Sequence, residues 1–308
     1  MRNTPVKGWS RWRPEAIRWP ATVAVALIAF ATLIAATVPR PPGPAPLRYR
    51  DPLFSSVQVA RDLTYGRAPD NQGNQVALKL DLYQPAGDTV NRRPAIAYVH
   101  GGGFSHGDKS AGADFATYFA RRGFVVVSVN YRLLAPPGCG GQPEPPPECV
   151  SAANAAQHDA QAAVRWLRAK RLTYRIDPTR IAMAGSSAGA ITTLLVAWRR
   201  EDPGNSGNPG YSSAIRAGAS ISGGTPTNQY ITQDDAPVIF FHGTEDRTVP
   251  YAWAVSNYRA MRNLGIASVF ESFEGAGHGL VQAGYRDVIY QQSEYFLYAR
   301  LDLAHAAR

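Results

Sequence analysis

The chain has 308 residues, which is enough for one large α/β domain with its own hydrophobic core. Its formal net charge of +9 is concentrated at one end, because residues 1–50 carry eight basic side chains and one acidic side chain. The other 258 residues carry 24 basic and 22 acidic side chains and are close to neutral. With no basic stripe or recognition helix in that part, the sequence argues against a nucleic-acid partner.

A basic leader opens the chain over residues 1–38. Its positive charges end at Arg18, and residues 21–38 then run without a charge. Eighteen residues at 1.5 Å per residue are just long enough to span a bilayer, whereas the apolar core of a signal peptide is usually shorter. We therefore favour an uncleaved membrane anchor, with a cleaved signal peptide or a buried N-terminal helix as alternatives. Either export signal leaves the basic end in the cytoplasm and the remainder outside it.

The leader is followed by a segment rich in proline, which predicts an extended linker over residues 39–50 and a catalytic domain over 51–308. In the domain, strand-like and helix-like segments alternate, as a mostly parallel sheet flanked by helices requires. Eight strands are predicted near Val57–Tyr65, Ala77–Tyr83, Ala95–Val99, Phe124–Asn130, Arg180–Ala184, Ala217–Ser222, Val238–Phe241 and Ser268–Phe273. Helices are predicted near Ala111–Arg122, Ala152–Lys170, Ala188–Arg200, Ala252–Leu264 and Arg286–Leu303.

The first candidate functional motif is His100-Gly101-Gly102-Gly103-Phe104, directly after a buried strand. Consecutive glycines let the backbone turn sharply and point bare N–H groups into a cleft. Such donors can stabilise the oxyanion of a tetrahedral intermediate. We predict that Gly102 and Gly103 supply two of them, while a flexible glycine loop is the alternative.

The two cysteines of the chain, Cys139 and Cys149, lie in one proline- and glycine-rich stretch. A pair that closes such a loop in an exported protein predicts a disulfide. No metal-binding spacing with histidine accompanies the pair, so no metal site is expected.

The second motif is Gly185-Ser186-Ser187-Ala188-Gly189, which lies between a strand-like and a helix-like run. A serine flanked by glycines at such a switch is typical of a nucleophile elbow, in which the neighbours two positions away must be small. Ser187 is the candidate nucleophile, and the N–H of Ala188 is the candidate third oxyanion donor.

Two further loops follow strand-like runs and complete a triad. Asp246 lies just past one strand and can orient a histidine, with the adjacent Glu245 as its rival. His278, in a loop of small residues, can take the serine proton and return it to the leaving group. The order serine, acid, histidine differs from that of the trypsin-like and subtilisin-like enzymes.

On these motifs the chain resembles an α/β-hydrolase esterase of the hormone-sensitive-lipase-like type. It is similar there to bacterial carboxylesterases and to their deacetylase, feruloyl-esterase and polyester-depolymerase relatives. The likeness extends from about Leu78 to the C-terminal helix. It implies a serine carboxylesterase that needs no cofactor and acts on short-chain, acetyl or aryl esters, free or polymer-linked. An amidase or peptidase with the same triad, or a catalytically silent binding module, is the alternative.

The shape of the cleft and the roles of other polar residues are predicted from the loops. The interval 223–236 is short and has no helical periodicity, so we expect little or no lid and an open, shallow cleft. Residues 134–150 and 202–211 are its expected walls, with Tyr230 and Tyr285 as contributors. His100 is expected to brace the oxyanion loop, His242 to belong to a turn, and Asp159 to begin a helix. His106, Asp108 and Lys109 are further candidates for lining the cleft.

Overall fold

The structure is a computed structural model that describes residues 37–136, 138–139 and 144–306. The apolar stretch predicted as an anchor or signal therefore lies outside the described residues, apart from its last two positions. Within the described ranges, none of the helices combines the length and the apolar character that a bilayer crossing needs.

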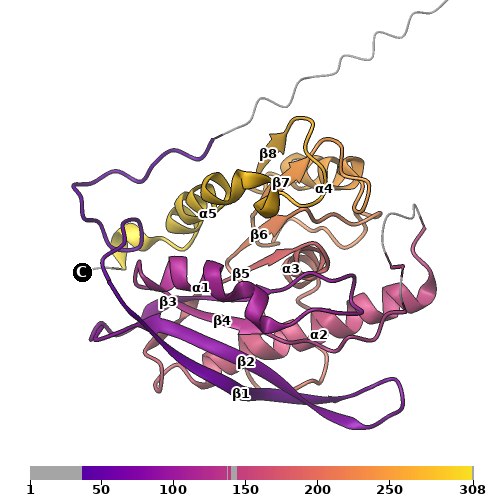
Figure 1. Cartoon of the computed structure of the whole chain (residues 1–308), viewed down its shortest axis with the longest axis horizontal. Coiled ribbons are helices and arrows are strands. Elements are labelled where there is room, and N and C mark those ends of the chain that lie inside the picture. Colours follow the sequence, from indigo (N-terminus) through magenta and orange to yellow (C-terminus); the bar gives the residue numbers. More distant parts are fainter. Residues whose placement is uncertain (1–36, 137, 140–143, 307–308) are drawn as a thin grey trace, which may run out of the picture. The chain divides into compact units, whose positions relative to one another are not determined.

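One sheet of eight strands forms the centre of the domain, in the order β1-β2-β4-β3-β5-β6-β7-β8 (Figure 1). The β1–β2 and β2–β4 pairs are antiparallel, and all other neighbours are parallel. The predicted fold, a mostly parallel eight-stranded sheet flanked by helices, is thus confirmed. The strands are β1 (Val57–Pro69), β2 (Gln75–Pro85), β3 (Arg93–Val99), β4 (Val125–Val129), β5 (Ile176–Ser186), β6 (Ala217–Ile221), β7 (Val238–Gly243) and β8 (Val269–Phe273).

Helices cover both faces of the sheet because the central strands are apolar on both sides. Along β3, Ala95, Ala97 and Val99 belong to one buried cluster, whereas Ile96 and Tyr98 belong to the other. The first cluster packs against α2, α3 and α4, and the second packs against α1 and α5 (Figure 1). The helices are α1 (Ala113–Ala120), α2 (Pro147–Ala169), α3 (Ala188–Trp198), α4 (Tyr251–Asn263) and α5 (Arg286–Arg300).

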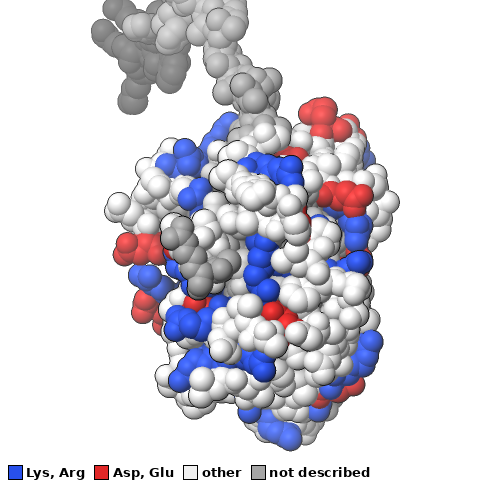
Figure 2. All heavy atoms as spheres, turned by 90° about the vertical axis from the view of Figure 1, so that its left-hand side faces the viewer, with Lys and Arg blue, Asp and Glu red and all other residues white. Residues whose placement is uncertain are grey.

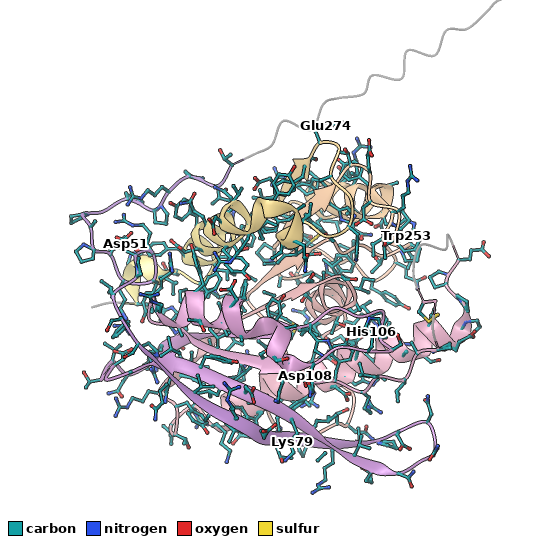
Figure 3. The ribbon with its side chains drawn as sticks, viewed as in Figure 1. Asp51, Lys79, His106, Asp108, Trp253 and Glu274 are labelled. Carbon is teal, nitrogen blue, oxygen red and sulfur yellow. A yellow bond between two sulfur atoms is a disulfide. The ribbon has the colours of Figure 1, made fainter. Side chains whose placement is uncertain are left out.

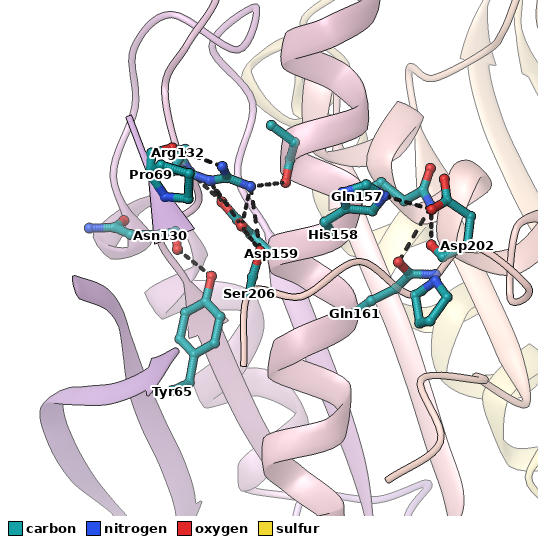
Figure 4. Close-up of polar contacts among 12 residues, drawn as sticks. Tyr65, Pro69, Asn130, Arg132, Gln157, His158, Asp159, Gln161, Asp202 and Ser206 are labelled. Carbon is teal, nitrogen blue, oxygen red and sulfur yellow. Dashed lines mark hydrogen bonds and ion pairs between the residues drawn. The ribbon is translucent and has the colours of Figure 1, made fainter. Parts of the chain in front are cut away.

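Helix α2 begins five residues before the predicted start at Ala152, because Pro147 suits its first turn, where no backbone N–H is needed. The prediction that Asp159 begins a helix is therefore wrong. Asp159 lies in the middle of α2, fully buried, and pairs with Arg132 at 2.8 Å (Figure 4). The Arg132 guanidinium also donates to the Pro69 carbonyl at 2.9 Å, so one buried ion pair joins α2 to the β1–β2 hairpin.

The 202–211 segment packs beside this ion pair and does not line the active-site pocket described below, contrary to expectation. The Ser206 hydroxyl donates to Asp159 at 2.6 Å (Figure 4). Asn208 donates to the Tyr65 carbonyl at 2.6 Å, and Arg165 donates to the Gly207 carbonyl at 2.8 Å. These bonds hold the segment against α2 and β1.

Residues 39–50, expected to form an extended linker, pack on the domain (Figure 1). Tyr49 is fully buried and meets the ring of Phe124 edge-on at 5.3 Å. Arg50 is also buried and donates to the carbonyls of Pro41 and Gly43 at 2.9 Å. Because Tyr49 is buried against Phe124, the folded unit extends to the N-terminal side of residue 51.

The face on which this segment lies carries charges of both signs. Figure 2 shows Lys and Arg side chains there with Asp and Glu among them and uncharged surface between. Within the N-terminal segment, Arg48 forms an ion pair with Asp88 and Arg50 forms one with Asp51. The Arg48–Asp88 pair is largely buried, and it joins the N-terminal segment to the loop between β2 and β3.

Candidate active site

Ser187 lies at the sharp turn between β5 and α3, with a φ of 55° and a ψ of −121°. This conformation is strained for a residue with a side chain, and it persists where the surroundings enforce it. The turn is tight enough that a Cβ on Gly185 would lie 2.2 Å from the Gly189 carbonyl oxygen. A Cβ on Gly189 would lie 2.0 Å from the carbonyl oxygen of Val99. Glycine is therefore sterically required at positions 185 and 189, as the predicted elbow demands.

We expect Gly189→Ala to destabilise the protein by about 3 kcal/mol or more, because the added methyl meets backbone that cannot move aside. The measurement is the free energy of unfolding in urea. Gly277→Ala is the matched control, since a Cβ there would meet nothing within 4 Å. Equal stability of the two variants would contradict this account of the elbow.

The three residues predicted as a triad are brought together by hydrogen bonds. His278 Nε2 lies 2.8 Å from Ser187 Oγ, and its Nδ1 lies 2.8 Å from Asp246 Oδ2. The Ser222 hydroxyl donates to the His278 carbonyl at 2.8 Å and so positions the loop that carries the imidazole. Ser187 and Asp246 follow the carboxyl ends of β5 and β7, and His278 follows β8, which places all three at one edge of the sheet.

Asp246 is 7% exposed and accepts the backbone N–H groups of Thr248 and Val249, both at 2.9 Å. Burial alone would raise the pKa of Asp246, but hydrogen bonds with His242, His278 and the Val249 N–H outweigh it and hold the pKa well below its usual value. The carboxyl is thus an anion aimed at His278. Its rival Glu245 is exposed, and its own N–H donates to the carbonyl of Ala276.

His242 contributes to this arrangement in a way that the sequence reasoning missed. It is fully buried, and its Nε2 lies 3.1 Å from Asp246 Oδ2 and 2.9 Å from the Val249 carbonyl oxygen. Because both neighbours are acceptors, Nε2 carries the proton and donates. The carboxylate is therefore held by a second histidine, and the spacing of four residues from His242 to Asp246 was the only signal of this in the sequence.

The glycine loop after β3 lies against the elbow. A Cβ on Gly101 would lie 3.1 Å from the Cβ of Ser187, and Gly102 and Gly103 both have positive φ, at 114° and 58°. Gly102, Gly103 and Ala188 all line the pocket. The N–H of Ala188 opens α3 and so has no acceptor within the helix.

His100 supports this loop from behind. It is buried and stacks on Tyr131 with ring centroids 4.5 Å apart. Its Nδ1 lies 2.7 Å from the Gly101 carbonyl oxygen, and burial lowers the pKa of His100, so the ring is neutral and donates through Nδ1. Of the nearby polar candidates, His106 lines the pocket, whereas Asp108 is bonded to Asn130 instead. Lys109 pairs with Asp62 and Asp81, also away from the pocket.

A cavity of about 860 Å³ opens at Ser187, within the range of small-molecule sites. Figure 3 shows His106 and Trp253, which both line it, on the side of the domain opposite to Asp51. Its other walls are the disulfide loop, helix α3 and the stretch between β6 and β7. Residues from these walls include Cys139, Pro145, Cys149, Ile191, Leu195, Thr225 and Tyr230.

These walls border the space at Ser187 on several sides, where an open, shallow cleft was expected. The interval 223–236, all of it described, contains no helix, so there is no helical lid at that position. The walls come instead from extended chain and from the disulfide loop. Tyr230 lines the pocket as predicted, whereas the Tyr285 ring packs on Phe273 at 4.5 Å and does not.

Cys139 and Cys149 are joined in a disulfide with their Cα atoms 5.5 Å apart. Cys149 lies in the first turn of α2, so the bond ties the loop to a rigid element. Within the described residues, no cluster of three or more His, Cys, Asp or Glu side chains could hold a metal ion.

Replacing both cysteines with serine should lower the free energy of unfolding by about 2–3 kcal/mol on the loop-closure estimate. Because both cysteines line the pocket, we also expect KM for esters to rise. Urea unfolding and ester kinetics would be compared with and without dithiothreitol. The double variant has no disulfide to reduce, so it controls for any other effect of dithiothreitol. Unchanged stability and KM after reduction would contradict the prediction.

Comparison with solved structures places this site in a known fold. Esterase 2 of Thermogutta terrifontis, in its form phosphorylated by paraoxon, superposes with a TM-score of 0.64 and 26% sequence identity. The match covers 82% of this chain and 97% of the esterase. The chain is an α/β-hydrolase with the fold of this esterase.

Sequence comparison supports this assignment for the hydrolase. Residues 80–216 match the BD-FAE family, and residues 219–303 match the prolyl oligopeptidase family. A probable isoprenylcysteine alpha-carbonyl methylesterase of Oryza sativa subsp. japonica is 30% identical over 56% of this chain and 36% of its own length. Human arylacetamide deacetylase-like 2 is 34% identical over 49% of this chain and 33% of its own. The hydrolase thus spans about a third of the length of each of these two relatives.

Proposed function

We propose that this hydrolase is an exported serine carboxylesterase that cleaves short-chain, acetyl or aryl esters, whether free or attached to a polymer. The observation that carries the proposal is the continuous hydrogen-bonded relay from Ser187 through His278 to Asp246, with both bonds at 2.8 Å. Ser187 and His278 line a pocket that is large enough for a small ester.

The geometry supports acyl transfer by way of a covalent intermediate. Ser187 Oγ attacks the ester carbonyl while His278 Nε2 takes its proton, and the imidazolium that forms is stabilised by Asp246. The N–H groups of Gly102, Gly103 and Ala188 stabilise the negative oxygen of the tetrahedral intermediate. His278 then protonates the leaving alcohol, and water attacks the acyl-serine by the same steps in reverse.

The preference for short acyl groups rests on the pocket and on a relative. Disulfide-loop and β6–β7 residues enclose the space near Ser187, and the volume of about 860 Å³ has to hold both arms of the ester. The same Thermogutta esterase, in a propionate-bound structure, is 25% identical and has a TM-score of 0.63. The propionate bound in that relative favours a short acyl group here.

Export is supported by two independent features. The leader combines a basic start with the uncharged stretch 21–38. A disulfide that borders the active site also needs an oxidising compartment to persist. We propose that residues 21–38 anchor the hydrolase in the membrane, with a cleaved signal as the alternative.

The test is hydrolysis of nitrophenyl esters across acyl lengths from acetyl to palmitoyl by the purified, oxidised protein. We expect kcat/KM to peak at short acyl groups. A peak at long acyl groups would overturn the short-chain proposal, and no activity on any ester by folded protein would overturn the esterase proposal itself.

Peptide or amide hydrolysis is the second candidate, because the segment that carries Asp246 and His278 matches the prolyl oligopeptidase family. Aminoacyl and peptidyl nitroanilides would be assayed beside the esters. The esterase proposal predicts kcat/KM values for the anilides far below those for esters of the same acyl group, and the reverse ranking would favour the peptidase.

A further inference from the structure

We propose that the pocket of this hydrolase binds esters with one arm that carries a carboxylate, and that Arg199 is the side chain that pairs with it. The inference rests on the proposed esterase function and adds a substrate class to it. It comes from the charges that line the pocket, from the run of side chains along α3, and from the contacts that hold Arg199.

The pocket is lined by cationic side chains and by no acidic ones. Among the described residues that form its walls, Arg199 and Arg247 are arginines, and none is Asp or Glu. The absence of acidic side chains from the pocket wall does not reflect the composition of the domain, because residues 51–308 carry 22 acidic side chains and 24 basic ones. A pocket with arginines and without carboxylates favours an anionic ligand over a cationic one.

Arg199 lies at the far end of a stripe that begins at the nucleophile. Ser187, Ile191, Leu195 and Arg199 follow one another at intervals of four residues, and all four line the pocket. Residues four apart share one face of a helix, so the stripe follows the length of α3. At 1.5 Å per residue, the Cα atoms of Ser187 and Arg199 are ~18 Å apart. The apolar section between them suits a hydrocarbon or aromatic arm.

The guanidinium of Arg199 is held in place before any ligand arrives. It lies over the ring of Tyr230 at 4.6 Å and donates to Asn154 at 2.5 Å. Its other terminal nitrogen donates to Asp202 at 2.6 Å. The side chain is only 15% exposed, so little conformational freedom remains to be lost when a ligand binds.

Asp202 pairs with Arg199 from outside the pocket and leaves other N–H donors of the guanidinium unused. It lies outside the pocket lining, its side chain is 45% exposed, and it also bonds to His158 at 3.0 Å (Figure 4). A guanidinium has five N–H donors, and the bonds to Asn154 and Asp202 use two of those on Arg199. The remaining donors can bind a carboxylate, as arginine does in paired recognition.

The experiment compares kcat/KM for matched pairs of substrates. Nitrophenyl monoesters of dicarboxylic acids, from succinate to sebacate, are set against nitrophenyl esters of monocarboxylic acids of the same chain length. A second series places the carboxylate on the alcohol, with carboxyalkyl acetates set against alkyl acetates. The readout is the ratio of charged to neutral substrate, measured for the wild type, Arg199→Gln and Arg259→Gln.

We expect the wild type to prefer the charged partner in one of the two series, and the preference to fall about ten-fold or more in Arg199→Gln. Arg259 is an exposed arginine on α4 that does not line the pocket, so its variant controls for loss of one surface charge. A ratio that is the same in wild type and Arg199→Gln would overturn the inference while leaving the esterase proposal intact.

A binding measurement keeps the inference testable if no ester is turned over. Calorimetric titration of the Ser187→Ala protein with sebacate and with decanoate compares a dianion and a monoanion of equal length. Tighter binding of sebacate that is lost in Ser187→Ala/Arg199→Gln supports the site, whereas equal affinities overturn it. Thermal melting of each variant verifies that it is folded.

Discussion

Ser187→Ala is expected to reduce kcat for ester hydrolysis by about 10⁴-fold or more, because removing the nucleophile of a triad abolishes the acyl-enzyme route. The side chain projects from the strained turn at the start of α3, with its Oγ 2.8 Å from His278 Nε2. The remaining activity would come from binding and from the oxyanion donors alone. The measurement is the steady-state rate with nitrophenyl acetate at substrate saturation.

The neighbouring Ser186 provides the control for this prediction. It ends β5, and its substitution by alanine should change kcat by less than about ten-fold, because no hydrogen bond links it to His278. Labelling with a fluorophosphonate followed by mass spectrometry should place the adduct on Ser187 in the wild type and on neither serine in Ser187→Ala. Full activity in Ser187→Ala, or a label on Ser186, would contradict the assignment.

Asp246→Asn should lower kcat by about 10⁴-fold while leaving KM nearly unchanged. The carboxylate accepts the Nδ1–H of His278 at 2.8 Å and so fixes the tautomer that leaves Nε2 free to take the serine proton. An amide at this position can donate to Nδ1 and favour the wrong tautomer. The adjacent Glu245→Gln is the matched control and should retain activity within about two-fold, since Glu245 is exposed. The opposite ranking of the two variants would make Glu245 the acid.

The same carboxyl gives a prediction for stability against pH. Its pKa in the folded protein lies below that in the unfolded chain, so Asp246 contributes stability above the unfolded pKa of about 4, and this contribution is lost as the pH falls further. Asp246→Asn should therefore make unfolding in urea less dependent on pH below about 4. An unchanged dependence would show that the folded pKa is not lowered.

The sequence predicted those parts of the site that depend on local chain geometry. The elbow needs glycine at 185 and 189, because a Cβ there meets backbone. The glycine-rich loop follows β3 as predicted, and the eight predicted strands all exist, since their apolar runs and intervening turns are local signals. The start of α2 was missed because prolines suggested loop, although Pro147 fits the first turn of a helix.

The choice between Asp246 and Glu245 could not be made from local pattern. Both acids lie in one loop after β7, and only the packing of that loop against the His278 loop decides which one faces the imidazole. The bond from His242 to Asp246 depends on the same packing. Asp159 was assigned to a helix terminus, yet its partner Arg132 lies 27 residues earlier in the chain.

By itself the sequence predicted the eight strands and the motifs that hold the candidate nucleophile, acid and base, because each strand and each motif is a short run of neighbouring residues. The tertiary structure alone decided which residues line the pocket, which acid contacts His278 and where Arg199 lies. These depend on side chains from distant segments that meet only when the sheet and helices pack. Their partners, such as Asn154 on α2 for Arg199 and Tyr230 beyond β6, cannot be read from spacing.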